Sequence, residues 1–191
     1  MKRKFFGVIL LLLSLSTAFI SCTKDNEPEP QKNIARLGAQ ENPAHGAFLS
    51  VSEKKVYTQA NAFQNQDKID ILCFFELANG NNIAIAAPGS NITGIFVGES
   101  APQNWTVKNQ TYFTDPATEI TPVQFDQLKD GDAIIQSYYN ESITTGNRRK
   151  RDMKVNDIYA FKTASGTYGL FKVTAVEQGA TGYVEFEYKL K

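Results

Sequence analysis

Histidine is almost absent from this chain, which has only His45 in 191 residues. A serine or cysteine nucleophile usually needs a histidine base beside it. His45 lies in Asn42-Pro43-Ala44-His45-Gly46, among small and flexible residues, and the chain has no Gly-x-Ser-x-Gly motif. We therefore expect an exposed histidine and no catalytic triad.

Cysteine is also scarce, because Cys22 and Cys73 are the only two. Cys22 is expected to be lipidated, as argued below, so Cys73 would have no partner for a disulfide within the chain. One thiol and one histidine supply too few ligands for a zinc site. The apolar neighbours of Cys73 predict a small buried residue and not a reactive thiol.

Acidic residues are present, but no metal-binding or catalytic motif contains them. Asp130, Asp132 and Glu141 match positions 1, 3 and 12 of an EF-hand loop. Ile134 and Ile135 stand where that loop requires an oxygen ligand and a glycine. We expect no calcium site, and we interpret both aspartates as turn or cap residues.

A carboxylate pair for glycoside hydrolysis has no fixed sequence spacing. Asp70 and Glu76 would lie roughly 20 Å apart on one strand, which is too far. Glu185 and Glu187 would be close enough, but they alternate with apolar residues and are interpreted as solvent-facing. We expect no enzymatic activity, no metal and no cofactor, and a glycan-active hydrolase is the weakest alternative.

Net charge also limits the possible partners, because 20 basic residues balance 20 acidic ones. Loss of the leader described next would remove Lys2, Arg3 and Lys4 and no acid, which leaves a mildly acidic chain. Such a chain has no long-range attraction to phosphate backbones, so we expect no nucleic-acid partner.

The chain does have an export signal at its N-terminus. Lys2-Arg3-Lys4 precede an apolar run over residues 5–20, which Ser21-Cys22 closes. This order is typical of a signal peptide, and a cysteine at the cleavage point is the site of diacylglycerol attachment. We expect residues 1–21 to be removed and Cys22 to be lipidated. Ordinary cleavage and a retained transmembrane helix are the alternatives.

Phe19-Ile20-Ser21-Cys22 resembles a bacterial lipobox, with Phe19 where leucine is usual. The tract Lys24-Asp25-Asn26-Glu27 is similar to the surface-export signal of Bacteroidota lipoproteins. The globular part loosely resembles uncharacterised lipoproteins of that group in two stretches, Lys68-Ile69-Asp70 and Tyr168-Gly169-Leu170-Phe171-Lys172-Val173. The resemblance implies an anchor in the outer membrane and a domain at the cell surface, with a periplasm-facing domain as the alternative. It implies no activity.

Residues 22–44 are rich in proline, asparagine, glutamine and charge, and poor in large apolar residues. Such a segment cannot bury enough surface to fold alone, so we expect a flexible acidic linker. Residues 45–191 have a suitable size for one core and are expected to form a single β-rich domain.

Runs of β-forming residues bracket this domain. Residues 68–77 are apolar on both faces and predict a central strand, and Asn79-Gly80 predicts a hairpin turn into residues 82–87. Residues 47–57 and 105–113 predict two further strands.

The last third of the chain predicts a three-stranded antiparallel meander over residues 157–163, 168–176 and 183–189. In the last strand, apolar residues alternate with polar ones, so we expect its second face to be solvated. The alternating residues are Val184, Phe186, Tyr188 and Leu190 against Glu185, Glu187 and Lys189.

Between these β regions, Thr121, Pro122 and Gln124 predict a capping box and a helix over residues 122–129. Residues 133–139 have helical spacing but β-forming composition, so helix and strand both remain open. The expected fold class is mainly β, a β-rich α+β fold. It would be an antiparallel two-sheet sandwich or a partly open barrel with one or two short helices.

Two features are candidate ligand sites. Arg148-Arg149-Lys150-Arg151 is either a solvated loop or an anion contact, in which Arg148, Arg149 and Arg151 bind a uronic or sulfated glycan or a lipid phosphate. Trp105 is either part of the core with Phe113, its indole N–H bonded to a backbone carbonyl, or an exposed platform for a sugar.

These observations favour a non-enzymatic cell-envelope lipoprotein whose β domain binds a glycan or a protein partner. The alternative is a structural or accessory subunit of an envelope complex, without a soluble ligand. Tyrosine or tryptophan beside polar groups in a concave face would favour binding, whereas one apolar patch on a smooth surface would favour the accessory role.

Overall fold

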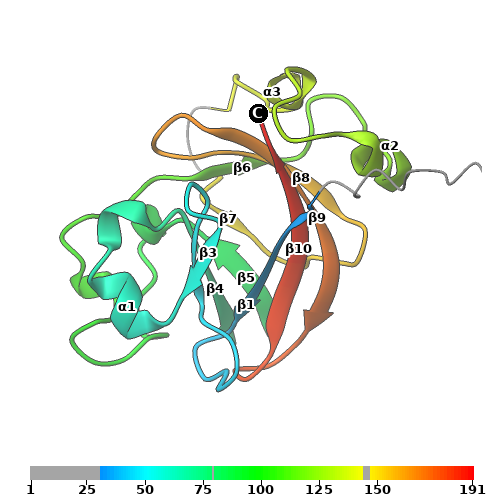
Figure 1. Ribbon diagram of the computed structural model, residues 1–191. Helices are drawn as coiled ribbons and strands as arrows, with labels where there is room; N and C mark the ends of the chain where they lie inside the picture. Colours follow the sequence, from blue (N-terminus) through cyan, green and yellow to red (C-terminus); the bar gives the residue numbers. More distant parts are fainter. Residues whose placement is uncertain (1–30, 79, 144–146) are drawn as a thin grey trace, which may run out of the picture.

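Alternating apolar residues in the strands build two antiparallel sheets that pack face to face (Figure 1). The structure, a computed structural model, describes residues 31–78, 80–143 and 147–191. Each sheet has five strands and both sheets are open, so the two-sheet fold class is confirmed and the barrel alternative is not.

One sheet, sheet A, has the strand order β1-β10-β9-β8-β6, and sheet B has the order β3-β2-β4-β5-β7. The strands of sheet A are β1 (Asn33–Gly38), β6 (Tyr112–Thr114), β8 (Ile158–Lys162), β9 (Tyr168–Glu177) and β10 (Tyr183–Leu190). The strands of sheet B are β2 (Phe48–Ser50), β3 (Lys55–Tyr57), β4 (Ile71–Glu76), β5 (Asn82–Ala86) and β7 (Arg149–Lys150). The helices are α1 (Gln59–Phe63), α2 (Pro122–Gln127) and α3 (Ile134–Ser137), with short 3₁₀ turns η1 (Gln66–Lys68), η2 (Pro88–Ser90) and η3 (Pro102–Asn104).

Strand β1 lies inside the segment for which we expected a flexible linker, so that expectation is wrong for residues 33–38. Ala35 and Leu37 are buried against the other sheet, and β1 pairs antiparallel with β10, with Leu37 opposite Val184. The segment is polar in composition, and the strand that pairs with β1 lies almost 150 residues further along the chain. Neither the composition nor the local pattern could therefore predict β1.

Two strand predictions need correction. Residues 47–57 form the hairpin β2–β3 and not one strand. Most of residues 105–113 is irregular, because side chains bind its backbone where a neighbouring strand would otherwise do so: Gln66 Oε1 accepts from Thr106 N at 2.8 Å and from Val107 N at 3.0 Å.

The other elements agree with the sequence patterns. Strands β4, β5, β8, β9 and β10 lie where they were predicted. The capping box of α2 is present, since Gln124 N donates to Thr121 Oγ1 at 3.3 Å and Thr121 N donates to Gln124 Oε1 at 2.8 Å. The open question over residues 133–139 is answered by helix α3. Asn79 lies outside the described residues, and Gly80 has a φ of +94°, as the turn requires.

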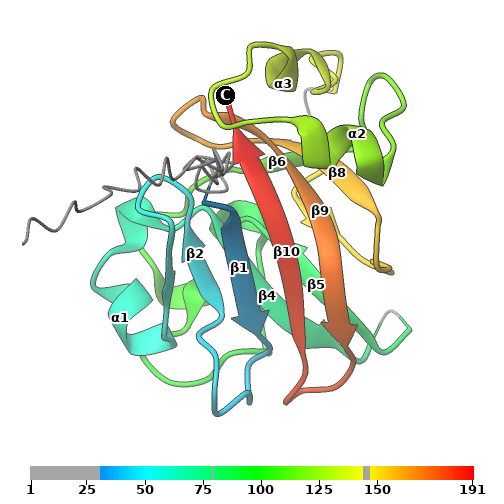
Figure 2. The same ribbon diagram turned by 45° about the vertical axis from the view of Figure 1, so that its right-hand side comes forward.

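Three apolar clusters hold the layers together. The largest fills the space between the sheets and includes Phe113, Phe171 and Phe186. A second covers the outer face of sheet B, and a third joins α2 and α3 to the outer face of sheet A. Figure 2 shows these two helices over one end of sheet A, near the C-terminus.

The helical cover also corrects the solvated face predicted for β10. Val184, Phe186 and Tyr188 face the core as predicted, but Glu187 and Lys189 on the other face are only 4% and 9% exposed. Local alternation could not show that another segment would cover this end of the strand.

No helix in the described ranges is both long enough and apolar enough to cross a membrane.

Candidate binding grooves

The structure gives each candidate arginine a partner within the protein. Arg148 Nη1 donates to Gly89 O at 2.6 Å, and Arg149 Nη2 donates to Ser90 O at 2.7 Å. Arg151 Nε donates to the Glu76 carboxylate at 2.8 Å. The segment includes β7, an edge strand of sheet B paired with β5, so the solvated-loop interpretation is wrong. These arginines bind the turn η2 and Glu76 at the end of β4, which leaves fewer donors for an anion.

Trp105 is 4% exposed, and its indole Nε1 donates to Ser100 O at 2.8 Å. The interpretation as a buried tryptophan is correct, but its neighbours differ from those expected. Its ring lies 5.4 Å from that of Phe48, in the cluster outside sheet B, whereas Phe113 lies between the sheets. It therefore presents no face to a sugar.

The remaining sequence candidates do not form a reactive centre. Cys73 is fully buried as predicted, and burial raises the pKa of its thiol. His45 is half-buried and lies edge-on to Tyr183, with the ring centres 6.0 Å apart. Cys22 lies outside the described residues. Throughout the described ranges, no group of three or more His, Cys, Asp or Glu could hold a metal ion.

A charged groove of about 450 Å³ lies where the chain enters the fold, beside the end of β10. We call it the lysine groove. Helix α2 and the segment after it form one side, and the start of β1 forms the other. Its lining residues are Gln31, Lys32, Asn33, Asp126, Gln127, Leu128, Lys129, Asp130 and Lys189.

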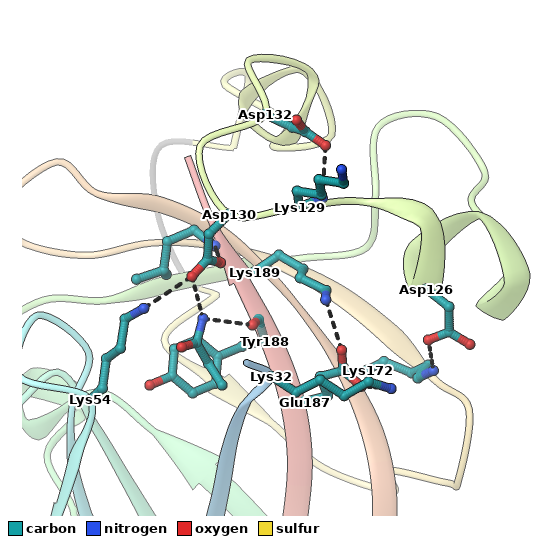
Figure 3. A network of polar contacts seen from close by, with 12 residues as sticks. Lys32, Lys54, Asp126, Lys129, Asp130, Asp132, Lys172, Glu187, Tyr188 and Lys189 are labelled. Atoms are coloured by element: carbon teal, nitrogen blue, oxygen red, sulfur yellow. Dashed lines mark hydrogen bonds and ion pairs between the residues drawn. The ribbon is translucent and has the colours of Figure 1, made fainter. Parts of the chain in front are cut away.

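Two buried lysines, Lys189 and Lys172, lie beneath α2 (Figure 3), and Lys189 lines the groove. Lys189 is paired with Glu187 at 2.8 Å, and Lys172 with Asp126. Their ammonium groups lie 5.7 and 5.1 Å from the centre of the Phe125 ring. Carboxylates and an aromatic face thus offset the cost of burying two cations.

Asp130 closes one end of the groove. It accepts hydrogen bonds from Leu190 N at 3.0 Å, Asn33 Nδ2 at 2.6 Å and Lys54 Nζ at 3.0 Å. Partial burial acts to raise the pKa of Asp130, but these three donors outweigh it, so the pKa lies below its ordinary value. Asp130 is therefore an anion that joins β1, the β2–β3 turn and the C-terminal strand.

The groove keeps an excess of positive charge. Lys129 is exposed, and its ammonium forms no ion pair with any residue that the structure describes. The side chains in and around the groove are five lysines and four acids: Lys32, Lys54, Lys129, Lys172 and Lys189 against Asp126, Asp130, Asp132 and Glu187. Figure 3 shows these lysines and acids close together around the end of β10. A polar ligand that carries an anionic group would complement it.

No pattern in the sequence predicts this groove. Its local signal is the charged run over residues 126–132, whose first part the sequence predicts as the end of a helix and whose Asp130 and Asp132 it predicts as turn or cap residues. Asp132 is such a turn residue, because its carboxylate accepts a hydrogen bond from Lys129 N at 2.8 Å. The pairing of Asp126 with Lys172 joins two segments far apart in sequence, so no local pattern could predict it.

A second groove, of about 570 Å³, lies at the end of β4 and contains exposed apolar side chains among polar ones. We call it the apolar groove. Leu77 and Val97 line it and are 74% and 81% exposed. Phe75, Ile95 and Arg149 are also part of its wall.

Comparison with known proteins does not identify a family. No protein-family model matches the sequence, and a search of curated proteins finds no similar one. One similar solved structure is that of a DUF4466 family protein from Parabacteroides merdae ATCC 43184, a member of the Bacteroidota, with 16% identity and a TM-score of 0.46. The similarity covers 85% of this chain and 55% of that one, so this chain spans about half the length of its relative.

Proposed function

We propose that the protein is a non-enzymatic lipoprotein of the cell envelope that binds an acidic glycan in the lysine groove. It would be anchored in the outer membrane through Cys22, with its β domain at the cell surface. The observation that carries the proposal is the groove itself, a hollow of about 450 Å³ with Lys189 in its wall and an unpaired Lys129 at its edge.

The chemistry of the groove suits uronic acids or sulfated sugars. Lysine ammonium groups donate to carboxylate and sulfate oxygens. The amides of Gln31, Asn33 and Gln127 line the same groove and can bind sugar hydroxyls. Because Lys129 and Lys32 are exposed, we expect binding to weaken as salt screens the charges.

The proposal includes the absence of enzymatic activity, and the ion pairs of the acids near the lysine groove support it. A glycosidase needs a protonated carboxyl as its general acid. In and beside this groove Asp126, Asp130 and Glu187 each pair with a lysine, and the pKa of Asp130 is lowered. The lowered pKa of Asp130 favours its ionised form, which cannot act as a general acid.

The test is a glycan array with the full chain, comparing uronic and sulfated glycans with neutral ones. We expect acidic glycans to bind and Lys129→Ala to weaken them about tenfold, because one charge-assisted hydrogen bond is lost. Lys154→Ala is the matched control, since Lys154 is exposed and does not line the groove. If no acidic glycan binds, or if both variants behave alike, the proposal is wrong.

A protein partner is the second candidate, and the apolar groove favours it. Two of the most exposed large apolar side chains of the described residues, Leu77 and Val97, line this one groove. Apolar surface gathered in this way is typical of protein contacts. This would suit an accessory subunit of an envelope complex.

A further inference from the structure

A third groove, of about 520 Å³, lies at the edge of sheet A opposite β1, and it differs in chemistry from the lysine groove. We call it the tyrosine groove. Strands β6 and β8 form its floor, and the segment after α3 forms its wall. Its lining residues are Gln110, Tyr112, Tyr139, Glu141, Ile143, Lys162, Thr163 and Ala164.

Strand register builds this groove. Lys162 of β8 pairs with Tyr112 of β6 on one side and with Tyr168 of β9 on the other. Directly paired residues project to the same face of a sheet, so these three side chains form one row across three strands. The Lys162 ammonium lies 4.6 Å from the centre of the Tyr168 ring and 5.8 Å from that of Tyr139.

Glu141, in the segment after α3, forms an ion pair with Lys162. Its carboxylate accepts from Lys162 Nζ at 3.3 and 3.2 Å and also from the Tyr168 hydroxyl. The hydrogen bond from Tyr168, followed by that from Lys162, lowers the pKa of Glu141. The side chain of Glu141 is nevertheless 57% exposed. An ionised carboxylate has about four lone-pair sites, so Glu141 retains acceptor capacity toward the groove.

Tyr112 is the remaining tyrosine of the row, and part of its side chain packs against the cluster that joins α2 and α3 to sheet A. It is half-buried, and in the part of the chain that the structure describes no other ring or cation stacks on it. Gln110 lies two residues before it, and its amide is oriented by Arg148 Nη1, which donates to Gln110 Oε1 at 3.0 Å. The groove therefore combines an aromatic face with an amide and an ion pair, all held by other contacts.

We infer that the tyrosine groove is a binding site for a neutral sugar. The apolar C–H face of a pyranose ring would pack on Tyr112, and its hydroxyls would bind Glu141, Lys162 and Gln110. Charge favours a neutral ligand, because Glu141 already pairs with Lys162 and the lining residues carry no net charge. This site goes beyond the proposed function, since both the groove and the class of ligand differ.

The experiment is titration of the full chain with a panel of neutral oligosaccharides, namely glucan, mannan, galactan and xylan fragments. We expect at least one to bind, and Tyr112→Leu to weaken it about tenfold, because leucine fills the volume without a flat aromatic face. Glu141→Gln should weaken it to a similar extent, while Tyr112→Phe, which keeps the ring, should bind almost as the parent does. Thermal unfolding of each variant confirms that it is folded.

Lys129→Ala is the control that separates the two sites. It should weaken acidic-glycan binding in the lysine groove about tenfold and leave binding of the neutral sugar unchanged. The inference is overturned if the parent chain binds none of the neutral fragments. It is also overturned if the bound fragment is unaffected by both Tyr112→Leu and Glu141→Gln, or is lost with Lys129→Ala.

Discussion

Asp70 is a buried carboxyl at the start of β4, only 6% exposed, and it has no lysine or arginine partner among the residues that the structure describes. Its Oδ2 accepts Val51 N at 2.8 Å. Burial raises the pKa of Asp70 from 3.8 to about 6, although the hydrogen bond from Val51 acts in the opposite direction. The folded protein therefore holds a proton here that the unfolded chain loses at lower pH.

This difference predicts a pH-dependent loss of stability. Well below pH 3.8 both states are protonated. From there to about pH 6 only the unfolded chain ionises Asp70, so the folded state loses stability, and above about pH 6 both states are ionised. We expect this residue to lower the free energy of unfolding by on the order of 3 kcal/mol between those pH values.

Asp70→Asn keeps an acceptor for Val51 N but cannot ionise, so this contribution should disappear. Urea unfolding of both proteins from pH 4 to 8 measures it, and the difference between the two curves removes the effect of carboxylates with lowered pKa, such as Asp130. Parallel curves would contradict the assignment of Asp70.

At the scale of elements, contacts within a few residues were predictable and long-range contacts were not. The capping box of α2 depends on Thr121 and Gln124, three residues apart, and it was predicted correctly. The basic segment before Asp152 looked like a solvated loop because its partners, Gly89 and Ser90, are 59 residues away. That segment is an edge strand whose arginines hold the turn η2.

This placement predicts that the arginines matter for stability. The double substitution Arg148→Ser and Arg149→Ser should lower the free energy of unfolding by about 2 kcal/mol, because each removes a half-buried charged hydrogen bond to a backbone carbonyl. Denaturant unfolding measures the effect. Lys154→Ser, an exposed residue in the next loop, is the control and should change stability little. An equal effect of both substitutions would restore the solvated-loop interpretation.

At the scale of the molecule, the fold depends on a strand from the segment that looked like linker. Strand β1 completes sheet A and covers the edge of β10 along six residue pairs. A chain that begins at residue 40 would lack this strand, whereas one that begins at residue 31 would keep it.

We expect residues 31–191 to unfold cooperatively on heating and residues 40–191 to be unfolded or aggregated. Loss of β1 removes Ala35 and Leu37 from the core and exposes the edge of β10, a loss comparable with the roughly 5–15 kcal/mol that stabilises a domain. Circular dichroism melting of both chains measures this. Equal melting temperatures would show that β1 is dispensable.

The amino-acid sequence alone determined the properties that depend on near neighbours: the β-rich class, the C-terminal meander, the cap of α2 and the burial of Cys73. Period-two alternation, turn residues and caps act over a few residues, so they can be read directly. The N-terminal export signal is of the same local kind and stays a prediction for Cys22.

Only the tertiary structure decided which polar residues lie together. Glu187 and Lys189 alternate as a solvated strand face does, yet α2 covers them and brings Asp126 beside Lys172. Tyr112, Lys162 and Tyr168 meet because the register of three strands aligns them. The lysine groove and the tyrosine groove are both formed by segments that are distant in sequence. The packing of the chain, and not a local pattern, sets such contacts.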